Sequence, residues 1–218
     1  MIYEDQDLLL VEKASGVITY PAENERKGSV IQLIRYYWKL RKQQHQHLYL
    51  LHRLDKETSG LLVFAKTTWA RQSLNLQFEQ HTVLREYVAV TQGIPARKAG
   101  RIKTFLGRDV RGKRSVASRG KTAVTHYNVV AENPQLRRSL IRCRLHTGRT
   151  HQVRIHLAHI SAPVVGDTVY GKHPSSRLAL HADTLGFLHP RTGRPVLFRL
   201  SLPDDLRKLL GHGSSPNF

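Results

Sequence analysis

A cluster of ionisable residues stands directly before a short apolar run near the start of the chain. The run Leu61 to Ala65 is apolar throughout, and the segment His52 to Gly60 before it carries both signs of charge. A carboxylate at the mouth of an apolar strand needs a cation or a hydrogen-bond donor, because desolvation otherwise raises its pKa and neutralises it. Asp55 is therefore a candidate catalytic carboxylate, and the alternative is a loop-capping aspartate.

Histidines crowd a later segment and raise the question of a metal site. They are His146, His151, His156 and His159. In a helix that begins near Thr150, His151 and His156 would lie on different faces, and no Cys or clustered carboxylate completes a ligand set. We therefore expect no metal here.

Five stretches of the chain resemble, in order, the motifs of one enzyme family. They are His52-Arg53-Leu54-Asp55-Lys56-Glu57-Thr58-Ser59-Gly60, Arg85-Glu86-Tyr87, the run LHTGRTHQVRIHL from Leu145 to Leu157, Gly166-Asp167 with Tyr170-Gly171, and Leu180-His181-Ala182 followed by His189-Pro190 and Thr192-Gly193. The first stretch is similar to the H-R-L-D-x-x-T-S-G signature of the RluA family of pseudouridine synthases. The resemblance extends from Asp7 to Pro203.

The chain departs from the family pattern in two places. It has Lys13-Ala14-Ser15-Gly16 where the family has Lys-Pro-x-Gly, so the glycine of the turn is kept and the rigid proline is absent. Many relatives also carry a small N-terminal RNA-binding domain of the S4 type, whereas here the catalytic pattern starts within ten residues of Met1. The resemblance is therefore to a compact form of the family.

The resemblance implies an enzyme that isomerises uridine to pseudouridine in a structured ribosomal or transfer RNA. The reaction breaks the N1–C1′ bond, rotates the uracil and joins C5 to C1′ with no net redox change, so we expect no cofactor. It also implies that Asp55 is the catalytic carboxylate, either as nucleophile at C1′ or as base at C2′.

Three further residues are implied in substrate binding. Arg154 would supply the positive charge that keeps Asp55 ionised, and Tyr87 would stack on the target uracil, with its hydroxyl available for removal of the C5 proton. Arg53 would fill the space that the extruded base vacates. His151 and His156 would orient their loop by hydrogen bonds.

Each of these assignments has a plainer alternative. Arg154 could contact an RNA phosphate or form a surface ion pair, and Tyr87 could be a core tyrosine. For the whole chain the alternative is a non-catalytic RNA-binding or ribosome-assembly protein on the same fold. A metal-dependent nuclease would require clustered ligands that the sequence does not supply.

Charge favours a polyanionic partner. The chain has 35 Lys and Arg against 16 Asp and Glu, a net charge of +19. Ten of the basic residues fall between Arg97 and Lys121 beside one acid, Asp109, and six arginines without an acid lie between Asn133 and Gly166. These two tracts predict one phosphate-facing surface, and the alternative is an ordinary solvated loop and strand face.

Length and composition set the broad class. A chain of 218 residues fits one large domain or two small ones, and the motif pattern favours a single catalytic domain over residues 1–211 with a disordered tail over 212–218. Cys143 is the one cysteine, so no internal disulfide can form, and no apolar run approaches the ~20 residues that cross a bilayer. The acidic first seven residues are unlike a secretory or transit leader. We expect a cytoplasmic monomer.

Periodicity predicts a mixture of strands and helices. We expect helices over Val30–Gln43 with Ser29 as N-cap, Thr68–Gln80, Thr150–Ile160 and a short stretch after Pro203, and strands over Leu8–Glu12, Leu61–Ala65, Leu84–Val90, Thr122–Val130, Ser139–His146, Leu178–Phe187 and Val196–Leu200. In one strand Cys143 shares the core face with Ile141 and Leu145, opposite Arg142 and Arg144. This predicts an α+β pseudouridine-synthase fold, a central and mostly antiparallel mixed sheet flanked by helices and loops.

Overall fold

The computed structural model describes residues 1–21, 28–42, 47–110 and 112–211. The chain forms two compact units: unit 1 comprises Met1–Val83 with Leu185–Phe198, and unit 2 comprises Leu84–Thr184 with the segment that starts at Arg199. The predicted helix end at Gln43 and the predicted tail lie outside the described residues. A single catalytic domain over 1–211 remains a prediction.

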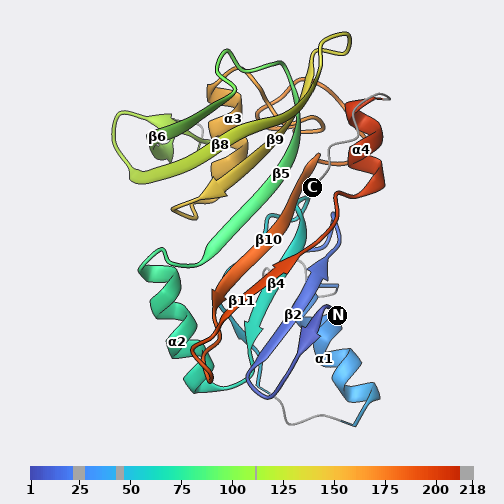
Figure 1. The fold of residues 1–218 in the computed structure, drawn as a ribbon, viewed down its shortest axis with the longest axis vertical. Helices are drawn as coiled ribbons and strands as arrows, with labels where there is room; N and C mark the ends of the chain where they lie inside the picture. Colours follow the sequence, from blue (N-terminus) through green and yellow to red (C-terminus); the bar gives the residue numbers. More distant parts are fainter. Residues whose placement is uncertain (22–27, 43–46, 111, 212–218) are drawn as a thin grey trace. The chain divides into compact units, whose positions relative to one another are not determined.

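Unit 1 is a sheet with two helices. Its elements are β1 (Tyr3–Glu4), β2 (Leu8–Lys13), α1 (Val30–Leu40), β3 (Tyr49–Leu50), β4 (Ser59–Ala65), α2 (Thr68–Glu79), the end of β10 (Leu180–Leu188) and β11 (Pro195–Arg199). The strand order is β1-β2-β4-β10, with β3 paired to β4 and β11 to β10 (Figure 1). All seven residues of β4 are buried, which confirms the interpretation of its apolar run as an interior strand.

Both helices of unit 1 begin at the residues that the sequence indicates. Ser29 forms a capping box with Gln32: the backbone N–H of Gln32 donates to Ser29 Oγ (3.3 Å), and the backbone N–H of Ser29 donates to Gln32 Oε1 (3.1 Å). Thr67 accepts from the backbone N–H of Ala70 (3.2 Å) at the start of α2. Side-chain caps therefore fix where each helix starts.

Unit 2 likewise combines β-strands with two helices. It contains β5 (Leu84–Gln92), β6 (Ala99–Arg108), β7 (Arg114–Ala117), β8 (Lys121–Asn133), β9 (Arg138–Leu145), α3 (Gln152–His159), the start of β10 and α4 (Asp204–Leu210). The strand order is β10-β5-β9-β8-β6-β7, and Figure 1 shows β5, β8 and β9 running through the middle of this unit. The pairs β5–β9, β8–β9, β6–β8 and β6–β7 are antiparallel, so the predicted α+β class is confirmed.

Register separates the two faces of the unit 2 sheet. Tyr87 lies opposite Cys143, which lies opposite Tyr127, so these three share one face. Helix α3 packs on this face, because His156 bonds both Thr125 of β8 (2.8 Å) and Thr104 of β6 (3.0 Å). The predicted core position of Cys143 is confirmed, and burial raises the pKa of its thiol to about 12.

The opposite face of the same sheet is basic and largely exposed. Arg144 lies opposite His126, which lies opposite Arg101, and all three side chains are exposed. This is the polar face that the alternation in Ser139–His146 predicts, and the register extends it over three strands.

Two sequence predictions for unit 2 are incomplete. Periodicity predicts no strand in the basic tract from Arg97 to Lys121, yet this tract contains all of β6 and all of β7, paired as a ribbon. The helix predicted over Thr150–Ile160 spans Gln152–His159, and its residues from Gln152 through Leu157 are all buried. A helix enclosed on all sides lacks the amphipathic pattern on which the prediction relies.

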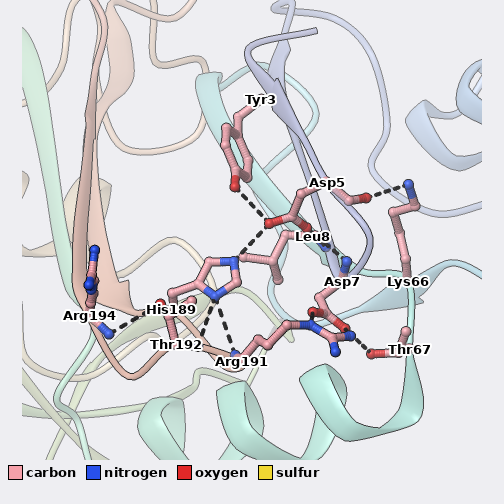
Figure 2. A network of polar contacts seen from close by, with 10 residues as sticks. All are labelled: Tyr3, Asp5, Asp7, Leu8, Lys66, Thr67, His189, Arg191, Thr192 and Arg194. Atoms are coloured by element: carbon pink, nitrogen blue, oxygen red, sulfur yellow. Dashed lines mark hydrogen bonds and ion pairs between the residues drawn. The ribbon is translucent and has the colours of Figure 1, made fainter.

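A polar network in unit 1 joins the first residues to the turn between β10 and β11 (Figure 2). Asp5 Oδ2 accepts from Tyr3 Oη (2.6 Å) and pairs with His189 Nε2 (2.8 Å). Asp7 accepts from Arg191 Nε (2.6 Å) and Nη2 (2.9 Å) and from Thr67 Oγ1 (2.9 Å). These bonds give the His189 to Gly193 motif a structural task, which is to hold the chain entering β2.

Replacing Asp7 with Asn tests this network through its pH dependence. The Arg191 guanidinium holds the pKa of the Asp7 carboxyl below its usual value, so the stabilisation is complete above the unfolded-state pKa near 4 and disappears as pH falls through the folded-state pKa. We expect Asp7→Asn to lower Tm by roughly 2–6 °C at pH 5 to 7 and the difference to vanish once the pH is below the folded-state pKa of Asp7.

Thermal unfolding followed by circular dichroism at several pH values measures this difference. Glu12→Gln, an exposed acid of the same β2 strand, is the matched control and should leave Tm within about 1 °C. A Tm difference for Asp7→Asn that stays constant down to pH 2 would mean that ionisation of Asp7 does not contribute.

Candidate active site

The signature loop of unit 1 is anchored by a buried lysine. Lys13, 1% exposed, donates from Nζ to the backbone carbonyls of Ala14 (2.9 Å), Val17 (2.6 Å) and Lys56 (2.8 Å). A buried ammonium carries three donors, and here each has a carbonyl acceptor. Lys13 therefore fixes the loop that contains Asp55 to the end of β2.

The turn after β2 adds two more bonds to the same loop. The backbone N–H of Gly16 donates to the carbonyl of Lys56 (2.9 Å), and Ser15 Oγ donates to the carbonyl of Glu57 (2.6 Å). Gly16 has φ +85°, a conformation in which a side chain would be strained. The turn that lacks the family proline is thus held by hydrogen bonds to the signature loop.

The backbone on either side of Asp55 is also fixed. Thr19 Oγ1 donates to the carbonyl of Leu54 (2.9 Å) and accepts from its N–H (3.3 Å), while the N–H of Thr58 donates to the carbonyl of Asp55 (3.1 Å). The side chain of Asp55 is half-buried and that of Arg53 is exposed. A rigid backbone carrying an accessible carboxylate suits catalysis at a bound ligand.

His52 supports the loop from its other end. Its Nε2 accepts from the backbone N–H of Val63 in β4 (3.2 Å), and its ring stacks on Phe78 of α2 with centroids 5.2 Å apart. The accepting nitrogen carries no proton, so the Nδ1–H tautomer is the one that this bond selects. The histidine of the signature therefore serves the loop's position.

In unit 2 the arginine of the third motif forms a buried bidentate ion pair. Arg154 donates from Nε to Asp167 Oδ2 (2.7 Å) and from Nη2 to Asp167 Oδ1 (2.8 Å), and both residues are less than 5% exposed. Burial raises the pKa of Asp167, but the hydrogen bonds from Arg154 and from the backbone N–H of Tyr170 outweigh burial and hold that pKa below its usual value. The pair is charged at neutral pH and sets the direction of the guanidinium.

Gln152 and two histidines fix the start of α3. Gln152 accepts from Thr147 Oγ1 (2.8 Å) and from the N–H of Arg149 (2.9 Å), and donates to the carbonyl of Val124 (3.0 Å). His151 adopts the left-handed conformation with φ +58°, and its Nδ1 bonds Tyr170 Oη (3.0 Å). Burial lowers the pKa of His156 to about 4, so it bonds its threonines as a neutral ring. Both histidines thus form hydrogen bonds, His151 to Tyr170 and His156 to threonines of β8 and β6, and their role in orienting the loop stays a prediction.

Tyr87 lies on the face of the sheet that α3 covers. Its side chain is 9% exposed, and the neighbouring Arg85 donates to the carbonyl of His146 (3.1 Å). A Cβ at Gly148 would approach Arg85 Nη1 to 2.6 Å, so a side chain there would require the Arg85 guanidinium to shift. The structure thus places Tyr87 and Arg154 in unit 2, and Arg53 and Asp55 in unit 1.

Several residues that build these sites are not identified from the sequence as site residues. Lys13, Thr19, Gln152 and Asp167 all act through backbone groups or through another side chain. Two of them carry a signal in the sequence: Lys13 ends an apolar strand, and Asp167 lies inside a family motif. Within the described residues, no three His, Cys, Asp or Glu side chains gather as a metal site.

The chain is similar to a known family of proteins. Residues 7–159 match the family model described as RNA pseudouridylate synthase. The chain belongs to the RNA pseudouridine synthases of the RluA type. It is 37% identical over 213 residues to the uncharacterised RNA pseudouridine synthase YhcT of Bacillus subtilis, covering 96% of this chain and 70% of that protein.

Two further similarities extend the family assignment. A ribosomal large subunit pseudouridine synthase D of Zymomonas mobilis is 37% identical over 227 residues, covering 96% of this chain and 71% of that protein. The structure of human RNA pseudouridylate synthase domain containing 4 superposes with a TM-score of 0.76 at 22% identity, covering 94% and 92% of the two chains. The predicted pseudouridine-synthase fold is confirmed, and the chain is an RNA pseudouridine synthase.

Replacing Lys13 with Met tests the anchoring of the signature loop. The variant keeps the apolar stem but leaves three carbonyls without their donor, so we expect a loss of about 2–4 kcal/mol in the free energy of unfolding. Because the loop carrying Asp55 loses its anchor, the rate of pseudouridine formation should also fall at least about tenfold at temperatures where the protein stays folded.

Urea unfolding and single-turnover assays below the unfolding transition measure the two effects. Lys39→Met, an exposed lysine of α1, is the matched control and should change the free energy of unfolding by less than about 0.5 kcal/mol. A Lys13→Met protein that is destabilised but fully active would show that the anchor serves folding alone.

Proposed function

We propose that this pseudouridine synthase modifies large-subunit ribosomal RNA and uses Asp55 as its catalytic carboxylate. The support for Asp55 is its place in the loop that Lys13, Ser15 and Thr19 hold, where its backbone is fixed and its carboxylate is accessible. The support for the RNA is that similar proteins are named ribosomal large subunit pseudouridine synthase D. The net charge of +19 fits such a polyanionic substrate.

In this proposal Asp55 acts at the ribose of the target uridine. On the nucleophilic route a carboxylate oxygen of Asp55 bonds C1′ while the N1–C1′ bond breaks, and the electrons of the broken bond stay on the uracil. On the base route Asp55 removes the proton from C2′, and the N1–C1′ bond breaks in the same way. The uracil then turns and C5 bonds C1′. On the nucleophilic route this breaks the ester bond between Asp55 and C1′, and on the base route Asp55 returns the proton to C2′. The proton then leaves C5 while N1 gains one. Atoms and charge balance, and no other reactant enters.

Three residues complete the proposal. Tyr87 stacks on the extruded uracil and its hydroxyl assists loss of the C5 proton, and Arg154 supplies positive charge that favours the ionised carboxylate, with Asp167 holding the guanidinium in one orientation. Arg53, exposed beside the catalytic residue, occupies the space that the base leaves in the RNA.

The cytoplasm is the compartment that this proposal assigns, because an enzyme of ribosomal RNA acts where ribosomes assemble. No helix among the described residues is long and apolar enough to cross a membrane. A monomeric state remains a prediction.

Asp55→Asn tests the catalytic carboxylate. The amide keeps the shape of the side chain but removes its charge, so we expect pseudouridine formation to fall by at least about 10³-fold with RNA affinity within about threefold of wild type. Release of tritium from RNA containing 5-tritiated uridine, under single-turnover conditions, measures the rate.

Asp204→Asn, an exposed aspartate of α4, controls for the loss of one negative charge. An Asp55→Asn protein with more than a few per cent of the wild-type rate would remove Asp55 from the mechanism. The non-catalytic alternative would be favoured if the wild-type protein bound ribosomal RNA but formed pseudouridine neither in that RNA nor in any other cellular RNA.

Substitutions of Tyr87 separate its ring from its hydroxyl. Tyr87→Phe keeps the ring, so we expect unchanged RNA affinity and a release of the C5 proton slowed by about 10²-fold or more. Tyr87→Leu also removes the aromatic face and should weaken capture of the base by about 1–3 kcal/mol. Tritium release and binding to 5-fluorouridine RNA, whose C5 cannot lose a proton, distinguish the two steps.

Tyr127 provides the matched control for these variants. It flanks Cys143 from the other side on the same face and is similarly buried, and its hydroxyl donates to the carbonyl of Arg97 (3.3 Å). If Tyr87→Phe and Tyr87→Leu were as active as Tyr127→Phe, Tyr87 would be a structural residue of the sheet.

A further inference from the structure

Unit 2 contains a pocket that the proposed catalytic residues do not line. Its volume is about 410 Å³, and it is lined by Arg108, Gly112, Lys113, Arg114, His151, Val169 and Tyr170. Three of these side chains are permanently cationic, and none of the described residues that line it is acidic. A concave, basic site of this size fits an anionic group carried by a larger ligand.

The two arginines reach the pocket because of the β6–β7 pairing. Arg108 lies directly opposite Arg114 at the end of the ribbon, and Leu106 lies opposite Val116. Leu106 packs with Ala123 and Ile155 of α3, so alternation places Arg108 and Arg114 on the α3 face of the sheet. Two like charges directly opposite each other destabilise a ribbon, and an anion between them would relieve this repulsion.

Lys113 is held in place at the pocket before any ligand arrives. Its Nζ donates to the carbonyl of Val169 (2.7 Å) and lies 5.1 Å from the centre of the Tyr170 ring. The Arg154 guanidinium lies 5.3 Å from the centre of the same ring, and His151 bonds the Tyr170 hydroxyl. The hairpin is thus tied to the segment that orients Arg154, which lowers the ordering cost of binding an anion there.

We propose that this pocket binds a backbone phosphate of the substrate RNA at a nucleotide other than the target uridine. The inference rests on the proposed function, because it assumes an RNA substrate. Arginine pairs present the planar donors that match a phosphate, and the opening of the pocket at an exposed hairpin admits a polymer. The bound phosphate would hold the β6–β7 ribbon against Tyr170. It would thereby fix the position of the RNA relative to the segment that carries Asp167.

The test compares two pairs of arginine substitutions in the full-length chain. Arg108→Gln with Arg114→Gln empties the pocket of its arginines but leaves Lys113 and its bond to Val169 in place. Arg101→Gln with Arg144→Gln removes the same charge from exposed strand positions on the opposite face of the same sheet. Both pairs include one residue of β6, so they are matched in net charge and unit.

The measurement is the affinity of each protein for unmodified large-subunit ribosomal RNA, transcribed in vitro, at salt between about 50 and 200 mM. We call Arg108→Gln with Arg114→Gln the pocket pair and Arg101→Gln with Arg144→Gln the control pair. We expect the pocket pair to bind RNA roughly tenfold more weakly than the control pair. The slope of log affinity against log salt concentration should also become shallower by about 0.7 for each phosphate that the protein no longer neutralises. The single-turnover rate at saturating RNA should fall less than the affinity does.

Three outcomes would overturn the inference. Equal affinities and slopes for the two pairs would mean that the charges act only through the general field of the protein. A pocket pair with unchanged RNA affinity but abolished binding to an acidic protein would assign the pocket to a different partner. A double variant that unfolds, judged by circular dichroism, is replaced by Arg114→Gln alone; an RNA affinity and a salt slope equal to those of Arg101→Gln would likewise overturn the inference.

Failure of the proposed function looks different. If the wild type forms no pseudouridine in this RNA or in total cellular RNA, the substrate assignment is wrong. If the wild type modifies the RNA and the two pairs behave alike, only the pocket is wrong.

Discussion

The buried pair of Arg154 and Asp167 is the interaction on which the geometry of unit 2 depends. Two opposite charges leave water together, which is tolerable only because Asp167 also accepts from the backbone N–H groups of Val169 and Tyr170. That requirement fixes the turn after Gly166 and the position of the Tyr170 ring, and with them the two groups that Lys113 contacts, the Val169 carbonyl and the Tyr170 ring. Breaking the pair would leave an uncompensated buried charge and release the whole arrangement.

In unit 1 the loop that carries Asp55 is held in place through its backbone groups. A loop that carries an accessible carboxylate cannot be buried, so its rigidity comes from bonds to its carbonyls and N–H groups, supplied by Lys13, Ser15, Gly16 and Thr19. The absent proline of the first turn removes a covalent restraint on φ, and these four residues supply restraint by hydrogen bonding instead. A departure from the family pattern is thereby compatible with a fixed site.

The sequence was sufficient where a local rule coincides with the tertiary structure. Ser29 caps its helix, β4 is buried along its length, and the two faces of β9 follow alternation. It was insufficient where packing overrides pattern. Residues Gln152 through Leu157 of α3 are buried without an amphipathic stripe, and the β6–β7 ribbon interleaves basic with small and apolar residues and gains its strand character from the pairing of β6 with β8. Motif resemblance indicated Asp55, Tyr87 and Arg154, but the partners of a side chain such as Arg154 depend on where the chain returns, which periodicity does not show.

The position of Cys143 has a consequence for how this protein responds to oxidants and electrophiles. The sole thiol of the chain is fully enclosed between Tyr87 and Tyr127 and stays protonated far above neutral pH. Neither peroxide nor a maleimide reacts with such a group until β5, β8 and β9 separate, since reactivity requires an accessible thiolate. The enzyme therefore carries a built-in reporter: the rate of thiol labelling under native conditions measures how often the sheet of unit 2 opens.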